Sequence, residues 1–194
     1  DQSSGCMFVG ESLHLEDVTF ENCESVGGNG ASGMGDPAGA SGFGGALGAG
    51  SVLAADYAPN IWIENSKFLG NRAVRGTPPF TGVGSDTRRP DNGAAFLGSG
   101  SRKVGAVTLT NVLFNGNSAE RQGAMIIQNA ASVLISGSLF VGNTANGVDP
   151  FVTTNALVSN GSGRYGGFLV TGVSGNVTIN NGTRVDALMD VERD

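Results

Sequence analysis

Short stretches of the chain alternate apolar and polar residues, and each stretch ends at a turn-forming residue. In segment 107–114, Val107 and Leu109 flank a threonine, Asn111 follows, and Phe114 comes three residues later. Alternation with a period of two is typical of a half-buried strand, and Asn tolerates the left-handed backbone of a corner. The pattern therefore predicts two short strands that meet at a corner, with Phe114 buried beyond it.

The same spacing recurs along the chain. A Phe is followed three residues later by Asn in "KFLGNRA", "LFNGNSA" and "LFVGNTA", and by Cys in "TFENCES". Upstream apolar residues, and an Asp, Asn or Gly three residues before each Phe, fall into register. A fifth segment, "NVTINNGTR", fits the frame with Arg184 in the Phe position. The repeated positions form a Phe column and an Asn column: Phe20, Phe68, Phe114, Phe140, Asn71, Asn117 and Asn143.

A second recurring segment begins with Gly, continues with a small residue and ends in apolar residues. Its copies are "GCMFV", "GGALG", "GAAFL", "GAMII" and "GGFLV". The Gly and the small residue predict a crowded wall where larger side chains would clash. One such unit cannot bury its own apolar face, whereas stacked units can place like residues over like. We therefore predict an all-β chain, a single right-handed parallel β-helix domain over 1–194 with about five rungs.

Three insertions interrupt the repeats after the Asn turn, at about 24–43, 72–92 and 144–165. Equivalent insertion points place these loops on one side of the solenoid, as binding loops or as tolerated surface loops. Segment 184–194 has apolar residues at helical spacing and predicts a capping helix, with Arg184 marking the end of the Phe stack. Because the chain begins at Asp1 without an initiator Met, we expect it to be part of a longer protein.

Composition narrows the classes of partner. The net charge of −6 argues against a nucleic-acid-binding surface. No apolar run in the sequence approaches the roughly 20 residues of a membrane helix. Three glycosylation acceptors fit an extracellular protein: Asn160, Asn176 and Asn181. Cys6 and Cys23 fall in the Gly-Ala strand and the Asn turn of the first repeat, where they are either joined as a disulfide or remain two buried thiols.

The paired motifs resemble the repeats of chlamydial polymorphic outer-membrane proteins. The stretches that carry the resemblance are "FLGNRA", "FNGNSA" and "FVGNTA", paired with "GGAL", "QGAM" and "GGFL", and they cover most of the chain outside its insertions. The resemblance implies a parallel β-helix within an elongated surface passenger that takes part in adhesion. Cys23 and Arg184 depart from the motif, and the adhesive function is an analogy from the fold.

One outward-facing column includes His14, Trp62 and Leu134, six residues before each Phe. Such an apolar patch would serve as an interface with a partner or as a stacking platform for sugars, unless a loop covers it. We expect partners to be other segments of the parent protein, assembly subunits or glycans.

The best candidates for a metal-binding or catalytic site are the carboxylates of Glu16, Asp17 and Glu64. Stacked carboxylates could hold Ca²⁺ or serve a polysaccharide lyase or hydrolase, although a solvated turn edge explains them more simply. No phosphate loop or nucleophile–His spacing is present, so we expect no cofactor and no catalysis. The sequence thus predicts a non-enzymatic extracellular structural or adhesive module, with a carbohydrate-binding or carbohydrate-cleaving β-helix and a filament spacer as alternatives.

Overall fold

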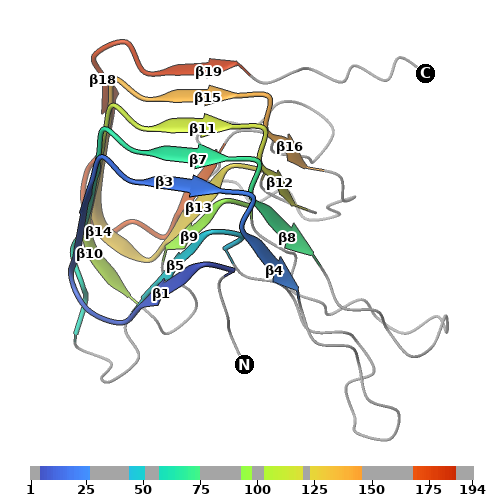
Figure 1. The fold of residues 1–194 in the computed structure, drawn as a ribbon. Helices are drawn as coiled ribbons and strands as arrows, with labels where there is room; N and C mark the ends of the chain where they lie inside the picture. The colour runs from blue at the N-terminus through green and yellow to red at the C-terminus, as the bar shows by residue number, and fades with distance from the viewer. Residues whose placement is uncertain are drawn as a thin grey trace, which may run out of the picture.

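The computed structural model describes residues 5–26, 44–50, 57–74, 93–97, 103–119, 123–145 and 168–186. These residues form short strands collected in four parallel sheets, stacked as Figure 1 shows. Consecutive strands along the chain enter different sheets, and each sheet receives its next strand one turn later. We call one such turn a rung. The chain is therefore all-β with parallel strands in stacked sheets, an arrangement that fits a parallel β-helix.

The first and second sheets are built from the Gly-Ala segments and the alternating segments respectively. The first sheet contains β1 (Met7–Val9), β5 (Leu47–Ala49), β9 (Ala95–Leu97), β13 (Met125–Gln128) and β17 (Phe168–Thr171). The second sheet contains β2 (Leu13–Glu16), β6 (Ile61–Glu64), β10 (Val104–Thr110), β14 (Ala130–Ser136) and β18 (Val177–Asn180).

The third and fourth sheets follow the corner. The third sheet holds the Phe residues in β3 (Thr19–Glu21), β7 (Lys67–Leu69), β11 (Leu113–Asn115) and β15 (Leu139–Val141), and ends with β19 (Arg184–Asp186). The fourth sheet contains β4 (Glu24–Val26), β8 (Arg72–Val74), β12 (Ser118–Ala119) and β16 (Thr144–Ala145). The corner between the second and third sheets has φ between 47° and 59° at Asp17, Asn65, Asn111, Gly137 and Asn181. The left-handed corner predicted from Asp, Asn and Gly is confirmed.

The four predicted Phe residues form a stack through the core. Phe114 pairs in register with Phe68 and Phe140, and its ring centroid lies 4.7 Å from the first and 4.8 Å from the second. The Phe20 and Phe68 centroids are 5.0 Å apart. Phe168, which lies in the first sheet, extends the stack with its centroid 4.7 Å from Phe140. The spacing of Phe and Asn did not predict this fifth ring, because Phe168 belongs to a Gly-Ala segment.

The predicted position of Arg184 is wrong by one residue. Val185, rather than Arg184, lies opposite Phe140 in the register of the third sheet. The corner of the last rung has an additional residue, Gly182, because Asn181 to Thr183 occupies the space of Gly137 and Ser138. Val185 packs against the core in the Phe column, and the ring of Phe168 reaches Phe140 from the first sheet.

The predicted insertion boundaries also need correction. The first residues of all three, Glu24–Val26, Arg72–Val74 and Thr144–Ala145, are strands of the fourth sheet. The sequence frame missed them because these strands are only two or three residues long. Similarly, Arg184–Asp186 is a strand and not the start of a capping helix. Residues 187–194, and the remainder of each insertion up to its last residue, lie outside the described residues.

The Gly residues of the Gly-Ala segments lie where the backbones of two chain segments approach each other closely. A Cβ atom at Gly45 would lie 2.6 Å from the backbone nitrogen of Arg72, and one at Gly123 would lie 2.6 Å from that of Thr144. Real Cβ contacts do not occur at such distances, and backbone atoms cannot rotate away as a side chain would. The crowded wall predicted from the Gly-Ala pairs is therefore confirmed, and the fourth sheet forms its other side.

Candidate functional site

The Asn column forms a continuous ladder of amide hydrogen bonds in the buried interior. Asn117 Nδ2 donates to Asn143 Oδ1 at 2.8 Å and to the carbonyl oxygen of Phe68 at 3.0 Å. The backbone nitrogen of Asn117 also donates to Asn143 Oδ1, at 3.0 Å. Asn71 repeats the pattern toward Asn117 and Phe20. The amides of Asn71 and Asn117 therefore each link three rungs, which satisfies buried polar groups that would otherwise be costly.

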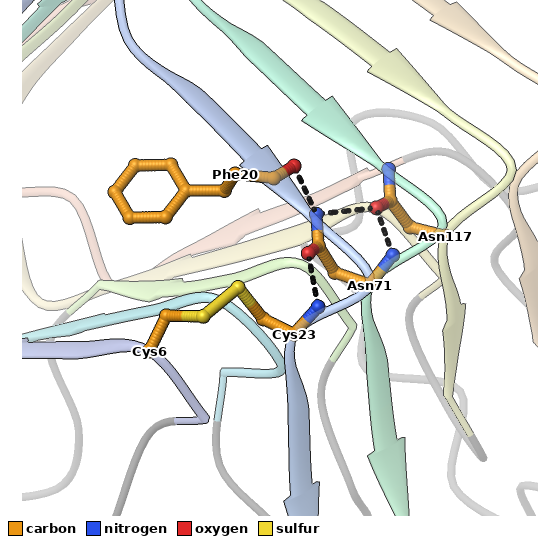
Figure 2. The surroundings of a disulfide bond; sticks show 5 residues. All are labelled: Cys6, Phe20, Cys23, Asn71 and Asn117. Carbon is orange, nitrogen blue, oxygen red and sulfur yellow. Dashed lines mark hydrogen bonds between the residues drawn. A yellow bond between two sulfur atoms is a disulfide. The ribbon is translucent and has the colours of Figure 1, made fainter.

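In the first rung the Asn ladder ends, and a disulfide takes its place. Figure 2 shows this disulfide beside Asn71. Cys6 and Cys23 are bonded, with their Cα atoms 5.7 Å apart. Cys23 occupies the Asn position, and its backbone nitrogen donates to Asn71 Oδ1 at 2.9 Å. Cys6 occupies the position taken by Ala46 in the next rung. Of the two alternatives left open by the sequence, the structure has the disulfide. It links the residue before β1 in the first sheet to the turn between β3 and β4, where the chain passes from the third to the fourth sheet.

The structure contains a second buried polar column that the spacing of the repeats did not predict. Ser66 and Ser138 are buried beside the corner, two residues before their Phe. Each hydroxyl accepts a hydrogen bond from the backbone nitrogen of the preceding rung, Val18 or Val112, at 3.1 Å. Each also donates to a carbonyl oxygen two residues earlier. The sequence does contain a signal for this column, because the residue two before each Phe alternates between Val and Ser from one repeat to the next.

The predicted outward column is present on the second sheet. Burial alternates along β6, where Ile61 and Ile63 are buried while Trp62 and Glu64 face outward and are partly exposed. We call the cross-strand set containing Trp62 the Trp62 column, and the parallel set two residues further along the Glu64 column. The Trp62 column contains His14, Trp62, Thr108, Leu134 and Thr178. The Glu64 column contains Glu16, Glu64, Thr110, Ser136 and Asn180.

Charges gather at one end of this face. His14 Nε2 lies 3.7 Å from Glu64 Oε1, and the two side chains are 57% and 38% exposed. Such a solvated pair contributes little to stability, so it acts mainly by setting the local charge. Glu16 lies directly beside Glu64 in register. From the third rung onward, the outward residues of both columns are Thr, Ser, Asn and Leu, and none is charged.

The calcium prediction at Glu16, Asp17 and Glu64 is not supported. In the described part of the chain, no three His, Cys, Asp or Glu side chains come together closely enough to hold a metal ion. Asp17 occupies the left-handed corner beyond the end of β2, whereas Glu64 faces His14 on the sheet. The alignment of the repeats places the three carboxylates close together, but in the structure they do not come together as one metal site.

The glycosylation acceptors differ in their surroundings. Asn176 and Asn181 are both exposed. Asn181 lies at the left-handed corner, and its Nδ2 donates to Ser136 Oγ at 3.1 Å. Asn160 lies outside the described residues.

Comparison with known proteins adds no relative. No protein-family model, no curated protein and no solved structure matches the chain. Across the ranges that the structure describes, no helix is both long enough and apolar enough to cross a membrane.

Proposed function

We propose that the chain is a right-handed parallel β-helix of about five rungs, related to the repeats of polymorphic outer-membrane proteins. We further propose that it acts as a non-enzymatic structural or adhesive module of a larger extracellular surface protein or assembly. Its partners are other segments of that protein, assembly subunits or surface ligands. The sheet order supports the helical architecture, because the chain visits the four sheets in the same sequence in each of the first four rungs.

The main support for a non-enzymatic role is the use of polar groups in the interior. The buried polar side chains of the described residues are all Ser or Asn, and no ionisable side chain is buried among them. Catalytic acids and bases are commonly tuned by burial or by a close partner charge. Here the buried amides and the corner hydroxyls bond to neighbouring rungs, so the interior chemistry serves the stack.

Two further features support an extracellular setting. The disulfide between Cys6 and Cys23 fits an oxidising compartment, where such bonds form and persist. The acceptors Asn176 and Asn181 are exposed, as glycosylation requires. The outer faces of the parallel sheets then provide long, regular surfaces for adhesion.

Attachment of protein-coated beads tests this proposal against its enzymatic alternative. Beads carrying the folded chain are allowed to settle on surfaces coated with polysaccharides, with matrix glycoproteins or with the chain itself, and are then washed under flow. Beads carrying the reduced, alkylated and heat-denatured chain are the control. Retention of the folded chain on at least one surface, without release of new reducing ends from a polysaccharide, is expected. Release of reducing ends, or equal retention of both bead types, would overturn the proposal.

A further inference from the structure

The outer face of the second sheet presents side chains at a regular spacing along the stacking direction. Parallel strands lie about 4.8 Å apart, so the Trp62 column presents one side chain at each such step. Two aromatic rings come first in the column, at His14 and Trp62, and Thr108, Leu134 and Thr178 follow. This step is close to the length of one sugar unit in an extended polysaccharide. A linear ligand lying along the column would therefore meet one outward side chain at each unit.

Hydrogen-bonding groups flank the column on both sides. The Glu64 column supplies the hydroxyls of Thr110 and Ser136 and the amide of Asn180 on one side. On the other side, the residues two positions before Trp62, Thr108 and Leu134 are Asn60, Ala106 and Ser132. Hydroxyl and amide groups both donate and accept, as the hydroxyls of a sugar ring do. A column that carries a Trp ring and a Leu side chain among hydroxyls, with polar groups beside it, suits a pyranose chain, which has apolar ring faces and polar edges.

The distribution of charge selects the kind of polysaccharide. The outward columns of the third, fourth and fifth rungs carry no charged side chain, and the first two rungs carry two carboxylates with one His. An anionic polysaccharide would meet Glu16 and Glu64 without a cationic row to neutralise it. Trp62 is only partly exposed, so part of its ring packs on the protein and the rest remains open to a ligand.

We infer that the outer face of the second sheet binds an extended, neutral polysaccharide that runs along the stacking axis, with one sugar ring placed on Trp62. Thr108 and Leu134 then contact the next two units, and the flanking hydroxyls and amides bond to the sugar edges. This inference rests on the proposed adhesive function and names the ligand class for that function. The neighbouring third sheet lacks the same pattern, because its outward column joins Lys67 to Leu113 and Leu139.

The sequence allows a direct readout, because Trp62 is the only Trp in the chain. The full chain is titrated with cellohexaose, chitohexaose and mannohexaose, and separately with hexagalacturonate and a heparin hexasaccharide. Tryptophan emission and its quenching by acrylamide are followed. At least one neutral hexasaccharide should change the emission saturably and protect the ring from acrylamide. If none does, or if only the acidic sugars do, the inference is wrong.

Substitutions at two positions and a matched control connect the signal to the face. Calorimetric titration should show that Trp62→Ala weakens binding of the neutral sugar about tenfold or more, while Trp62→Phe restores part of the affinity. Thr108→Glu should weaken it similarly, because the carboxylate replaces a neutral contact. Asn115→Glu places the same charge on an exposed position of the third sheet in the same rung and should leave affinity unchanged.

The melting temperature of each variant separates loss of binding from loss of folding. Equal affinity of Trp62→Ala and wild type, or equal effects of Thr108→Glu and Asn115→Glu, would overturn the inference. The bead assay remains an independent test of the proposed function. Beads that attach to a glycoprotein or to the chain itself, while neutral sugars do not bind, would refute the ligand class and leave adhesion intact.

Discussion

Replacement of Phe114 by Ala is the substitution that most directly removes one step of the stack. The Phe114 side chain is fully buried, and its ring lies between those of Phe68 and Phe140. The rings are nearly parallel, with interplanar angles of 6° and 4°. Alanine would remove both ring contacts and leave a cavity in the middle of the column, where neighbouring rungs are held by their strand pairing and relax only partly.

The expected magnitude follows from this environment. Truncation of a buried Phe to Ala costs about 3–5 kcal/mol, and each aromatic pair contributes about 0.5–1.5 kcal/mol beyond buried area. With two ring neighbours and complete burial, Phe114→Ala should lie at the upper end, about 4–5 kcal/mol. Phe20 is 9% exposed and stacks on Phe68 at 5.0 Å, in the first rung. Its replacement should cost about 3 kcal/mol.

Guanidinium denaturation followed by circular dichroism measures both free energies of unfolding. Phe114→Leu keeps much of the apolar volume and loses the ring contacts, so it should fall between Ala and wild type. Asn115→Ala, an exposed neighbour on the same strand, should change stability by less than about 0.5 kcal/mol. A loss below about 1 kcal/mol for Phe114→Ala, or a cost no larger than that of Phe20→Ala, would refute the reasoning about the stack.

Three further changes test the other contacts between rungs. Asn117→Ala should lower the free energy of unfolding by about 3 kcal/mol or more, because it leaves several buried donors and acceptors without partners. Chemical denaturation measures this loss. Gly123→Ala should cost about 3 kcal/mol, because the new methyl group would collide with the backbone of Thr144. Calorimetry should show a lower melting temperature. Reduction of the bond between Cys6 and Cys23 should cost about 3 kcal/mol by freeing a short loop in the unfolded chain. Hydrogen exchange should then accelerate in the first rung before the others.

Each of these predictions has its own comparison. An Asn117→Ala protein as stable as Asn115→Ala would show that the buried ladder contributes nothing. Gly116 has φ of 65°, and a Cβ atom there would meet nothing within 4 Å, so its replacement by Ala should cost only about 1 kcal/mol. A Gly123→Ala cost no greater than this would contradict the close approach. Uniform acceleration of exchange over the described rungs on reduction would contradict a local role for the disulfide.

The repeat allowed much of the fold to be predicted from the sequence. A parallel stack aligns identical positions, so the Phe, Asn and corner columns could be read from spacing alone. The Trp62 column followed from the same frame, since the period of two decides which side chains face outward. Its register from His14 through Trp62 to Leu134 is as predicted.

Features that depend on individual contacts could not be predicted in this way. The fourth sheet was missed because two-residue strands such as Ser118–Ala119 have no detectable alternation. The one-residue expansion at Gly182 shifted Val185 into the Phe column, and spacing alone placed Arg184 there. The separation of Asp17 from Glu64 depends on the direction of side chains at a corner, which the order of residues does not reveal.

Nuclear Overhauser contacts between selectively labelled Phe rings test the central claim most directly. The account places identical side chains of successive rungs on top of one another, so the ring protons of Phe114 should show contacts to both Phe68 and Phe140 and none to Phe20. Observation of these two contacts is the predicted result. Contacts of Phe114 restricted to residues near it in the sequence, without either neighbouring Phe, would contradict the account.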